Sequence, residues 1–419
     1  METTGPMETT GCVVVGGGPA GMMLGLLLAR AGVQVTVLEK HADFFRDFRG
    51  DTVHASTIRL IDELGLGEEF RRLPQSRLTS VAFPVPGGPP VTVGNFDALP
   101  APYNYVAMMP QWDFLNFLAA AAAQEPSFEL RMNHTATALM RNGGRVTGVH
   151  YVNADGTGGE LRADVVIATD GRHSTLRREA GLAPKEYTVP FDTWWFRLPR
   201  HASEQGAVAG IVPAFGRGEA LLALYRTDYF QMGYLAPKAA GARIRAEGIE
   251  GFRRRIAALR PDLADRVDAI ASLEDLHWLD VRLDRLREWH INGLLCIGDA
   301  AHAMSPAGGV GINLAVQDAV AAAAGLAPAL LRGRVLRAEL AKVQRRRLLP
   351  TVLVQTAQRM MHKVLFEPIM TGKRSGAPSA LLFLAGHIPA VGRLVPRFIA
   401  FGPRPEHAPA FARRAPQVP

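Results

Sequence analysis

Three glycines near the amino terminus have the spacing of a turn that binds a dinucleotide. Gly16, Gly18 and Gly21 lie between an apolar, strand-like run at 13–15 and an apolar, helical stretch at 22–30. In such a turn the first glycine permits a tight bend, the second lets a pyrophosphate approach the backbone, and the third lets helix and strand pack closely. The amides at the start of the helix favour phosphate charge. The predicted cofactor contacts of this turn are Gly16, Gly18, Pro19, Ala20 and Gly21.

An acidic residue follows the next predicted strand, 33–38. Glu39 can accept hydrogen bonds from both hydroxyls of an adenosine ribose, and Lys40 beside it is also predicted to contact the cofactor. Strand, helix and strand in this order form a βαβ unit, which predicts a parallel sheet. This first motif indicates a dinucleotide but does not distinguish FAD from NAD.

Two further motifs each place an aspartate after a buried strand. Asp170 follows the strand-like run 164–169, and Asp299 follows the run 294–297. Asp299 can bond a ribityl hydroxyl, and the glycines after it let a flat ring lie against the backbone. A helix that begins at Gly311 can stabilise negative charge on a reduced ring. The motif at 170–171 alone would be an ordinary turn. The predicted contacts of the motif around Asp299 are Gly298, Asp299, Pro306, Gly309, Gly311 and Asn313.

Together these motifs resemble the para-hydroxybenzoate hydroxylase family of FAD-dependent monooxygenases, the group A flavoprotein monooxygenases. The resemblance covers roughly residues 11–330 and is closest in GDAAHAMSPAGGVGINLAVQDA, which begins at Gly298. It implies that the dinucleotide is FAD and that His302 has a structural or flavin-positioning role. It also implies that the cofactor contacts include Asp170, Arg49 and Gln111.

The resemblance implies a specific activity. NAD(P)H would reduce FAD, and reduced FAD would react with O2 to give a C4a-hydroperoxyflavin that transfers one oxygen atom to an aromatic or polycyclic small molecule, with a role in secondary metabolism. Hydroxylation is the favoured outcome, and epoxidation or Baeyer–Villiger insertion stays open. Relatives lack a separate nicotinamide domain, which agrees with the single dinucleotide fingerprint in this sequence.

The predicted fold class is α/β, with a Rossmann-like FAD-binding domain, an inserted β-sheet substrate domain and a C-terminal helical segment. Residues 334–366 are expected to form one or two long helices, interrupted near Pro350. The expected domains are 7–75, 101–185 and 275–335 for FAD binding, 76–100 and 186–274 for substrate binding, and 336–419 for the helical region.

The substrate is expected between the flavin domain and the inserted sheet. Alternation along 193–198 places Trp194 and Phe196 on one face and Trp195 and Arg197 on the other. One of the two faces must pack against its own domain, so each aromatic residue is either a substrate contact or plain core. The substrate-binding candidates are Trp194, Phe196, Tyr225, Phe230, Met232 and Tyr234.

No general base is evident from the sequence. His54 lies near the expected flavin contact and is a candidate for proton transfer. Arg226 is a second candidate, since it or Arg197 can hold a carboxylate or phenolate, although a solvent-facing arginine is the commoner case.

Three other functions remain open. Flavin-dependent halogenases share the first motif and carry a WxWxIP signature, which Trp194-x-Phe196-x-Leu198-Pro199 misses at two positions. An isoprenoid-lipid reductase would use the same fold, and the apolar tail 379–402 then leaves peripheral membrane contact open. A non-catalytic FAD-binding scaffold is the third alternative.

Composition narrows the partners. The chain of 419 residues has a formal charge of +8, and its basic clusters at 253–255 and 345–347 suit a solvated helix face or an anionic partner. These runs contain no interleaved aromatic residues, so nucleic acid is not expected. Cys12 and Cys296 indicate neither disulfides nor a metal site, and fit a cytoplasmic location. We expect no transmembrane segment, and a monomer or homodimer.

Overall fold

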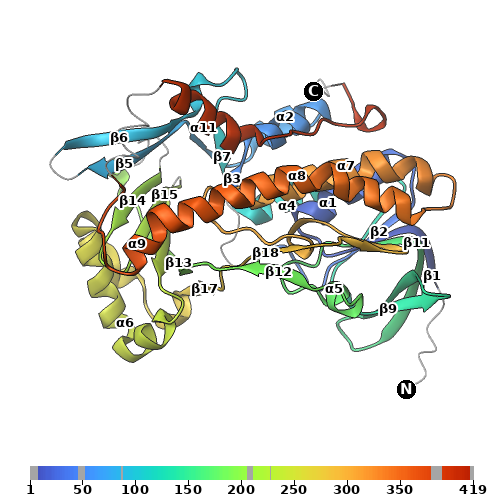
Figure 1. The fold of residues 1–419 in the computed structure, drawn as a ribbon, viewed down its shortest axis with the longest axis horizontal. Coiled ribbons are helices and arrows are strands. Elements are labelled where there is room, and N and C mark those ends of the chain that lie inside the picture. Colours follow the sequence, from blue (N-terminus) through green and yellow to red (C-terminus); the bar gives the residue numbers. More distant parts are fainter. Residues whose placement is uncertain are drawn as a thin grey trace.

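The computed structural model describes residues 8–45, 52–85, 88–204, 211–226, 228–378 and 389–415. Its largest sheet has eight strands and belongs to an α/β fold, toward the right in Figure 1. Six strands follow in the order β19-β20-β11-β1-β2-β8, and the hairpin β9–β10 extends from β11. The strands are β1 Glu8–Val15, β2 Val35–Leu38, β8 Phe128–Arg131, β9 Thr135–Asn142, β10 Arg145–Val152, β11 Gly158–Ala168, β19 His290–Ile291 and β20 Leu294–Cys296.

The parallel part of this sheet is buried, as the sequence predicts. β1 pairs in parallel with both β2 and β11, and β11 pairs in parallel with β20. Helix α1 (Pro19–Arg30) packs on the sheet, and α4 (Gln111–Ala122) and α7 (Gly311–Leu330) pack against α1. Residues 12–15 of β1 are at most 6% exposed, because a parallel sheet covered by helices buries near-continuous apolar runs.

A second, five-stranded antiparallel sheet is inserted after the fourth parallel strand. Its order is β14-β15-β16-β13-β17. Helix α6 and a 3-10 run pack on one of its faces around a separate hydrophobic core. The elements are β13 Asp192–Pro199, β14 Ile211–Phe215, β15 Ala220–Tyr225, β16 Tyr229–Ala236, β17 His277–Leu279, α6 Ala240–Leu259 and the 3-10 run Pro261–Ala269.

Short elements connect the two sheets. Three small sheets are β3-β7-β4, β5–β6 and β12–β18. Their strands are β3 Thr52–Val53, β4 Ser76–Leu78, β5 Ser80–Val85, β6 Gly88–Asn95, β7 Val106–Met108, β12 Pro184–Tyr187 and β18 Leu283–Leu286. The short helices are α2 Ala55–Glu63, α3 Gly67–Arg72 and α5 Thr175–Glu179, and 3-10 turns lie at Phe96–Ala98, Ala202–Glu204, Leu273–Asp275, Gly298–Ala300 and Ala410–Ala412.

The C-terminal helical segment crosses the front of the molecule in Figure 1. It comprises α8 (Arg337–Met361), a π-helical turn (His362–Phe366), α9 (Glu367–Met370) and α11 (Pro389–Phe401). The predicted interruption near Pro350 is wrong, since α8 passes through it. A proline inside a helix costs about 3 kcal/mol. Arg347 before the proline contacts α7, and Gln355 and Gln358 after it contact the loop at 303–307; these contacts offset that cost.

Helix α7 is the one helix in the described ranges with the length and apolar composition of a membrane span, and 83% of that window is buried in protein. The thiols of Cys12 and Cys296 are free and buried, and burial raises their pKa above the ordinary range. Within the described residues, no cluster of side chains suits a metal ion.

Candidate flavin and substrate site

The glycine turn between β1 and α1 leaves room for a ligand at one position only among its glycines. A Cβ on Gly21 would lie 1.9 Å from the carbonyl oxygen of Gly16, and a Cβ on Gly16 would lie 2.5 Å from the carbonyl oxygen of Thr169. A Cβ on Gly18 would meet nothing within 4 Å. Gly16 and Gly21 are thus required by the protein's own packing, whereas the space at Gly18 fits a pyrophosphate at the start of α1.

Glu39 is held beside this turn. Its side chain is 3% exposed, and its Oε2 accepts a hydrogen bond from the backbone amide of Gly17 at 2.7 Å. Its Oε1 accepts one from the amide of His41 at 3.0 Å. The carboxylate is therefore oriented before any ligand binds, as recognition of ribose hydroxyls requires. Lys40 next to it is exposed.

The second and third motifs meet at one ion pair. The guanidinium of Arg172 lies 3.2 Å from a carboxylate oxygen of Asp299, which joins the turn after β11 to the turn after β20. Asp170 is used locally, because its carboxylate accepts bonds from the hydroxyl of Ser174 at 2.5 Å and the amide of Thr175 at 2.8 Å. It thus caps α5, and burial raises the pKa of its carboxyl.

The loop at 303–310, which we call the glycine loop, contains Gly308 and Gly309 and leads into α7. Gly309 has φ +64°, and a Cβ there would lie 2.6 Å from the hydroxyl oxygen of Thr52. That hydroxyl donates to the carbonyl of Gly309 at 3.0 Å. The side-chain oxygen of Asn313, in the first turn of α7, accepts hydrogen bonds from the hydroxyls of Ser56 and Thr57, each at 2.7 Å. Asn313 therefore joins α7 to α2. Pro306 lies within this loop, and Gly311 is the first residue of α7.

The structure places His54 against the same loop. Its Nδ1 lies 2.8 Å from the carbonyl oxygen of Ile399 in α11, so Nδ1 donates. A Cβ on Gly309 would lie 3.5 Å from its Nε2. Burial lowers the pKa of His54, so the ring is neutral at neutral pH. This geometry links α2, α11 and the loop, and proton transfer by His54 stays a prediction.

The other FAD and catalytic candidates are placed as follows. Arg49 lies outside the described residues. Gln111 is half-buried and begins α4. Arg226 is 4% exposed in the turn between β15 and β16, and its carbonyl accepts from the guanidinium of Arg200. The roles proposed for these three residues stay predictions.

The aromatic face chosen from the sequence packs inside its own domain. Five of the six candidates are at most 5% exposed and belong to one core with α6, and the sixth, half-buried Tyr225, packs against that core. The aromatic rings of Phe196 and Tyr234 each make an edge contact with Phe252 of α6. We therefore correct the substrate assignment for Trp194, Phe196, Tyr225, Phe230, Met232 and Tyr234: these side chains fill the core under α6.

The opposite face of the sheet turns toward the flavin motifs. Trp195 packs against a cluster that contains Met304 and Val310 of the glycine loop. The guanidinium of Arg197 lies 5.8 Å from the ring centre of Trp112, the neighbour of Gln111 in α4. Cross-strand register adds Leu222, Leu224 and Gln231 to this face. The sequence contained a usable signal, since this face carries Arg197 and Gln231 whereas the core face is mostly apolar.

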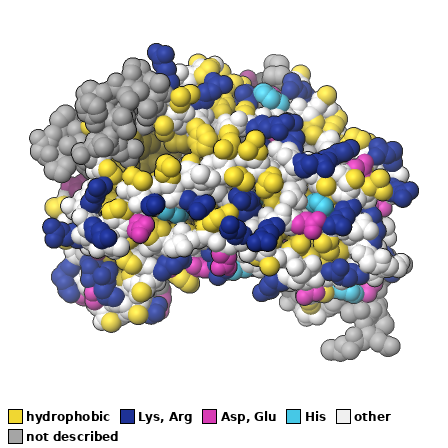
Figure 2. Space-filling view, viewed as in Figure 1, with side chains coloured by type: hydrophobic (Ala, Val, Ile, Leu, Met, Phe, Trp, Pro, Cys, Tyr) yellow, Lys and Arg dark blue, Asp and Glu magenta, His cyan; other side chains and the backbone are white. Residues whose placement is uncertain are grey.

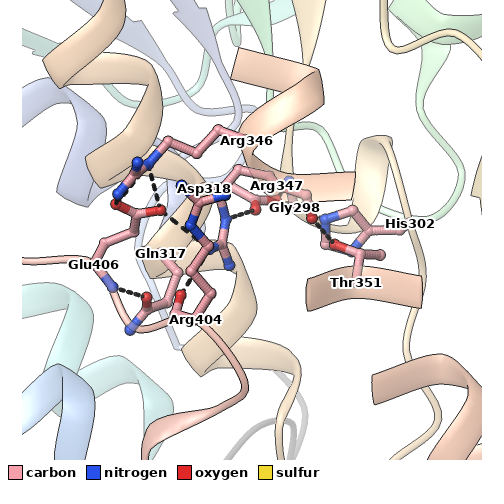
Figure 3. Close-up of polar contacts among 9 residues, drawn as sticks. All are labelled: Gly298, His302, Gln317, Asp318, Arg346, Arg347, Thr351, Arg404 and Glu406. Carbon is pink, nitrogen blue, oxygen red and sulfur yellow. Dashed lines mark hydrogen bonds and ion pairs between the residues drawn. The ribbon is translucent and has the colours of Figure 1, made fainter. Parts of the chain in front are cut away.

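Behind the third motif lies a buried polar network (Figure 3). Asp318 of α7 is fully buried, and its carboxylate accepts from the amide of Gly298 at 3.1 Å, from His302 Nε2 at 2.6 Å and from Arg347 Nε at 2.9 Å. Burial alone would raise the pKa of Asp318, but His302 and Arg347 hold it below its ordinary value. The structural role expected for His302 has this physical basis.

The network continues into the C-terminal tail. Arg347 Nη1 lies 3.3 Å from Oε1 of Glu406. The other carboxylate oxygen of Glu406, Oε2, lies 2.6 Å from Arg346 Nη2. The amide of Glu406 donates to the side-chain oxygen of Gln317 in α7 at 2.5 Å. One chain of contacts thus runs from the flavin motif through α7 and α8 to the tail (Figure 3).

Further along α8, three more polar side chains hold the glycine loop. The carboxamide of Gln358 accepts from the amide of Ser305 at 3.3 Å and donates to the carbonyls of Ser305 and Ala307, each at 2.8 Å. His362 Nε2 lies 2.9 Å from the hydroxyl of Ser305. The carboxamide of Gln355 donates to the carbonyl of Ala303 at 3.4 Å. The loop that precedes α7 is therefore positioned by α8.

Comparison with known proteins agrees with this geometry. The model of the family described as FAD binding domain matches residues 8–356. The chain is 34% identical over 400 residues to 6-methylpretetramide 4-monooxygenase from Streptomyces rimosus, covering 94% of this chain and 92% of the relative. It is 29% identical over 326 residues to the 12-dehydrotetracycline 5-monooxygenase/anhydrotetracycline 6-monooxygenase of that species, 74% of this chain but 60% of the relative. The structure of p-nitrophenol 4-monooxygenase PnpA from Pseudomonas putida DLL-E4 superimposes with a TM-score of 0.76 at 23% identity, covering 95% of this chain and all of that one.

The glycine turn generates a paired prediction. Gly18→Ala should leave the apoprotein's thermal midpoint unchanged, since its Cβ meets nothing, but weaken FAD binding by about tenfold or more, roughly 1.4 kcal/mol, by obstructing the pyrophosphate. Gly21→Ala should lower the midpoint of the apoprotein itself. Fluorescence titration with FAD and calorimetry of the apoprotein measure both. Equal destabilisation by the two substitutions would contradict the assignment.

His362 generates a prediction on pH. Burial lowers its pKa to about 4, so the unfolded chain takes up the proton first as the pH falls below about 6.5. Stability should therefore decrease from pH 6.5 to 4, by at most about 1.4 kcal/mol per pH unit. His362→Gln, measured by urea unfolding at several pH values, should flatten this slope. The control is His150→Gln on β10, where the side chain is 40% exposed; an unchanged slope in His362→Gln would refute the prediction.

Proposed function

The chain belongs to the FAD-dependent monooxygenases of the FAD binding domain family, and from this premise we propose that it hydroxylates an aromatic or polycyclic small molecule with NAD(P)H and O2. The match along nearly the full length of both chains to a relative named 6-methylpretetramide 4-monooxygenase carries the proposal. In the overall reaction NAD(P)H gives two electrons, one oxygen atom enters the product and the other leaves as water. The match to a relative named as a monooxygenase favours monooxygenation over the halogenase and lipid-reductase alternatives.

The chain's own residues bind and orient the cofactor. FAD, when bound, supplies electron transfer from the nicotinamide and activation of oxygen. The pyrophosphate occupies the space at Gly18, where the amides at the start of α1 bind it, and the carboxylate of Glu39 accepts hydrogen bonds from the ribose hydroxyls. Asp299, fixed by Arg172, faces the ribityl chain, and the amino end of α7 stabilises negative charge on the ring. In the same proposal, the remaining cofactor contacts are Pro19, Ala20, Lys40, Arg49, Gln111, Asp170, Gly298, Pro306, Gly309 and Asn313.

The substrate lies, in this proposal, between the glycine loop and the sheet face that carries Trp195. Leu222 and Leu224 make that face apolar beside the indole, which excludes water and suits flat rings. Arg197 and Gln231 supply polar groups at its far side. The domain division proposed from the sequence places this face at the boundary between the FAD-binding and substrate-binding domains.

The activity is tested with the purified flavoprotein. A yellow flavin spectrum and NAD(P)H oxidation under O2, stimulated by members of a panel of phenols and polycyclic polyketides, are expected. Product formed under 18O2 should contain one labelled oxygen atom. Comparing NADH with NADPH at equal concentration identifies the electron donor. A product that requires halide, or substrate reduction that proceeds without O2, would overturn the proposal.

The sheet face generates a second prediction. Trp195→Ala should raise KM for the aromatic substrate by about tenfold, because the indole supplies apolar contact area of the kind worth 1.4 kcal/mol or more. Trp278→Ala is the matched control, since Trp278 is 58% exposed and lies on the edge strand of the same sheet. Steady-state kinetics with each variant at full FAD loading measure the effect. A KM that rises equally in both variants would show that Trp195 does not contact substrate.

A further inference from the structure

Helix α8 and its π-helical turn differ from an ordinary surface helix, because they bury several polar side chains and expose several aliphatic ones. Their buried side combines apolar residues such as Val354 with five polar residues, Arg347, Thr351, Gln355, Gln358 and His362. Their solvent side carries Leu349, Leu353, Met360 and Val364, which are 59%, 42%, 65% and 44% exposed. At 3.6 residues per turn these four side chains fall in one stripe. We call them the exposed aliphatic stripe.

Cations outnumber acidic residues around the stripe. Residues 340–405 contain eleven Lys and Arg but one acidic residue, Glu367, so the net charge of this segment, +10, exceeds the +8 of the whole chain. Lys342, Arg345 and Lys363 are exposed on the same side of the helix as the stripe. Within the part of the chain that the structure describes, none of these three forms an ion pair. Figure 2 shows hydrophobic and basic side chains together along the band that α8 occupies in Figure 1.

Helix α11 repeats the combination. Leu394 and Val395 are 64% and 39% exposed, and Arg393 and Arg397 beside them are also exposed. The two helices thus present aliphatic side chains bordered by cations, and their described residues include no exposed aromatic side chain. Patches of exposed apolar side chains on a folded protein mark interaction surfaces.

We propose that the exposed aliphatic stripe and its cations dock the protein on an anionic lipid bilayer. Charge complementarity selects this occupant, because a second copy would bring like charges against like. Aliphatic side chains on a helix ridge enter the boundary between headgroups and acyl chains, and long Lys and Arg side chains reach the anionic headgroups beside them. The docking surface is separate from the flavin and substrate site, so the proposed lipid binding does not depend on which substrate the enzyme uses.

The test uses the FAD-loaded full chain in co-sedimentation with phosphatidylglycerol/phosphatidylcholine vesicles. Binding is expected at low salt, with little or none to pure phosphatidylcholine. It should weaken at high salt, where the Debye length shortens to about 3 Å at 1 M. Leu353→Glu should lower the affinity for anionic vesicles by about tenfold or more. A carboxylate that the anionic headgroups repel replaces an aliphatic side chain that enters the bilayer.

The matched control is Leu331→Glu at the end of α7, which is 61% exposed and lies outside the stripe. Its vesicle affinity should stay closer to that of the unmodified chain than the affinity of Leu353→Glu does. Flavin absorbance and thermal midpoint verify that both variants fold. Three results would each overturn the proposal: absence of binding to anionic vesicles at low salt, equal loss of affinity in both variants, or a lipid-free oligomer that Leu353→Glu dissociates, which would assign the stripe to a second copy.

Discussion

The buried carboxylate of Asp318 is the constraint on which the arrangement of the site depends. A charge without solvent is tolerated only when it is paired and hydrogen-bonded, and removing one partner of such a pair costs 3–5 kcal/mol by analogy with other proteins. The carboxylate of Asp318 accepts hydrogen bonds from Gly298, His302 and Arg347. These partners come from the flavin motif and from α8, so satisfying one carboxylate fixes two segments far apart in the sequence.

The polar residues on the buried side of α8 follow from a similar constraint. The loop at 303–307 exposes backbone amides and carbonyls to the interior, and each needs a hydrogen-bond partner. Gln355 and Gln358 supply those partners, and His362 bonds the hydroxyl of Ser305. Leu349, Leu353 and Met360 lie on the other side of the helix, in solvent. One helix therefore positions the flavin loop and at the same time presents an apolar surface.

Local motifs could be predicted because short-range geometry governs them. A Cβ cannot fit at Gly16 or Gly21 in a tight strand–turn–helix, and Glu39 follows its strand directly. The substrate face could not be predicted this way. Alternation separated Trp194 from Trp195, but both faces carried an aromatic residue, and only the packing of α6 against Trp194 decides which face is core. The uninterrupted passage of α8 through Pro350 likewise depends on distant contacts.

By itself the sequence determined the α/β class, the dinucleotide turn and the positions of the three motifs along the chain. These features depend on backbone conformation and on hydrophobic periods of two or 3.6 residues, which neighbouring residues specify. Only the tertiary structure decided which side of α8 is buried and which face of the inserted sheet turns toward the glycine loop. An unpaired buried polar group costs 1–3 kcal/mol, about as much as burying a leucine gains, so the choice of side rests on partners that the local sequence does not contain.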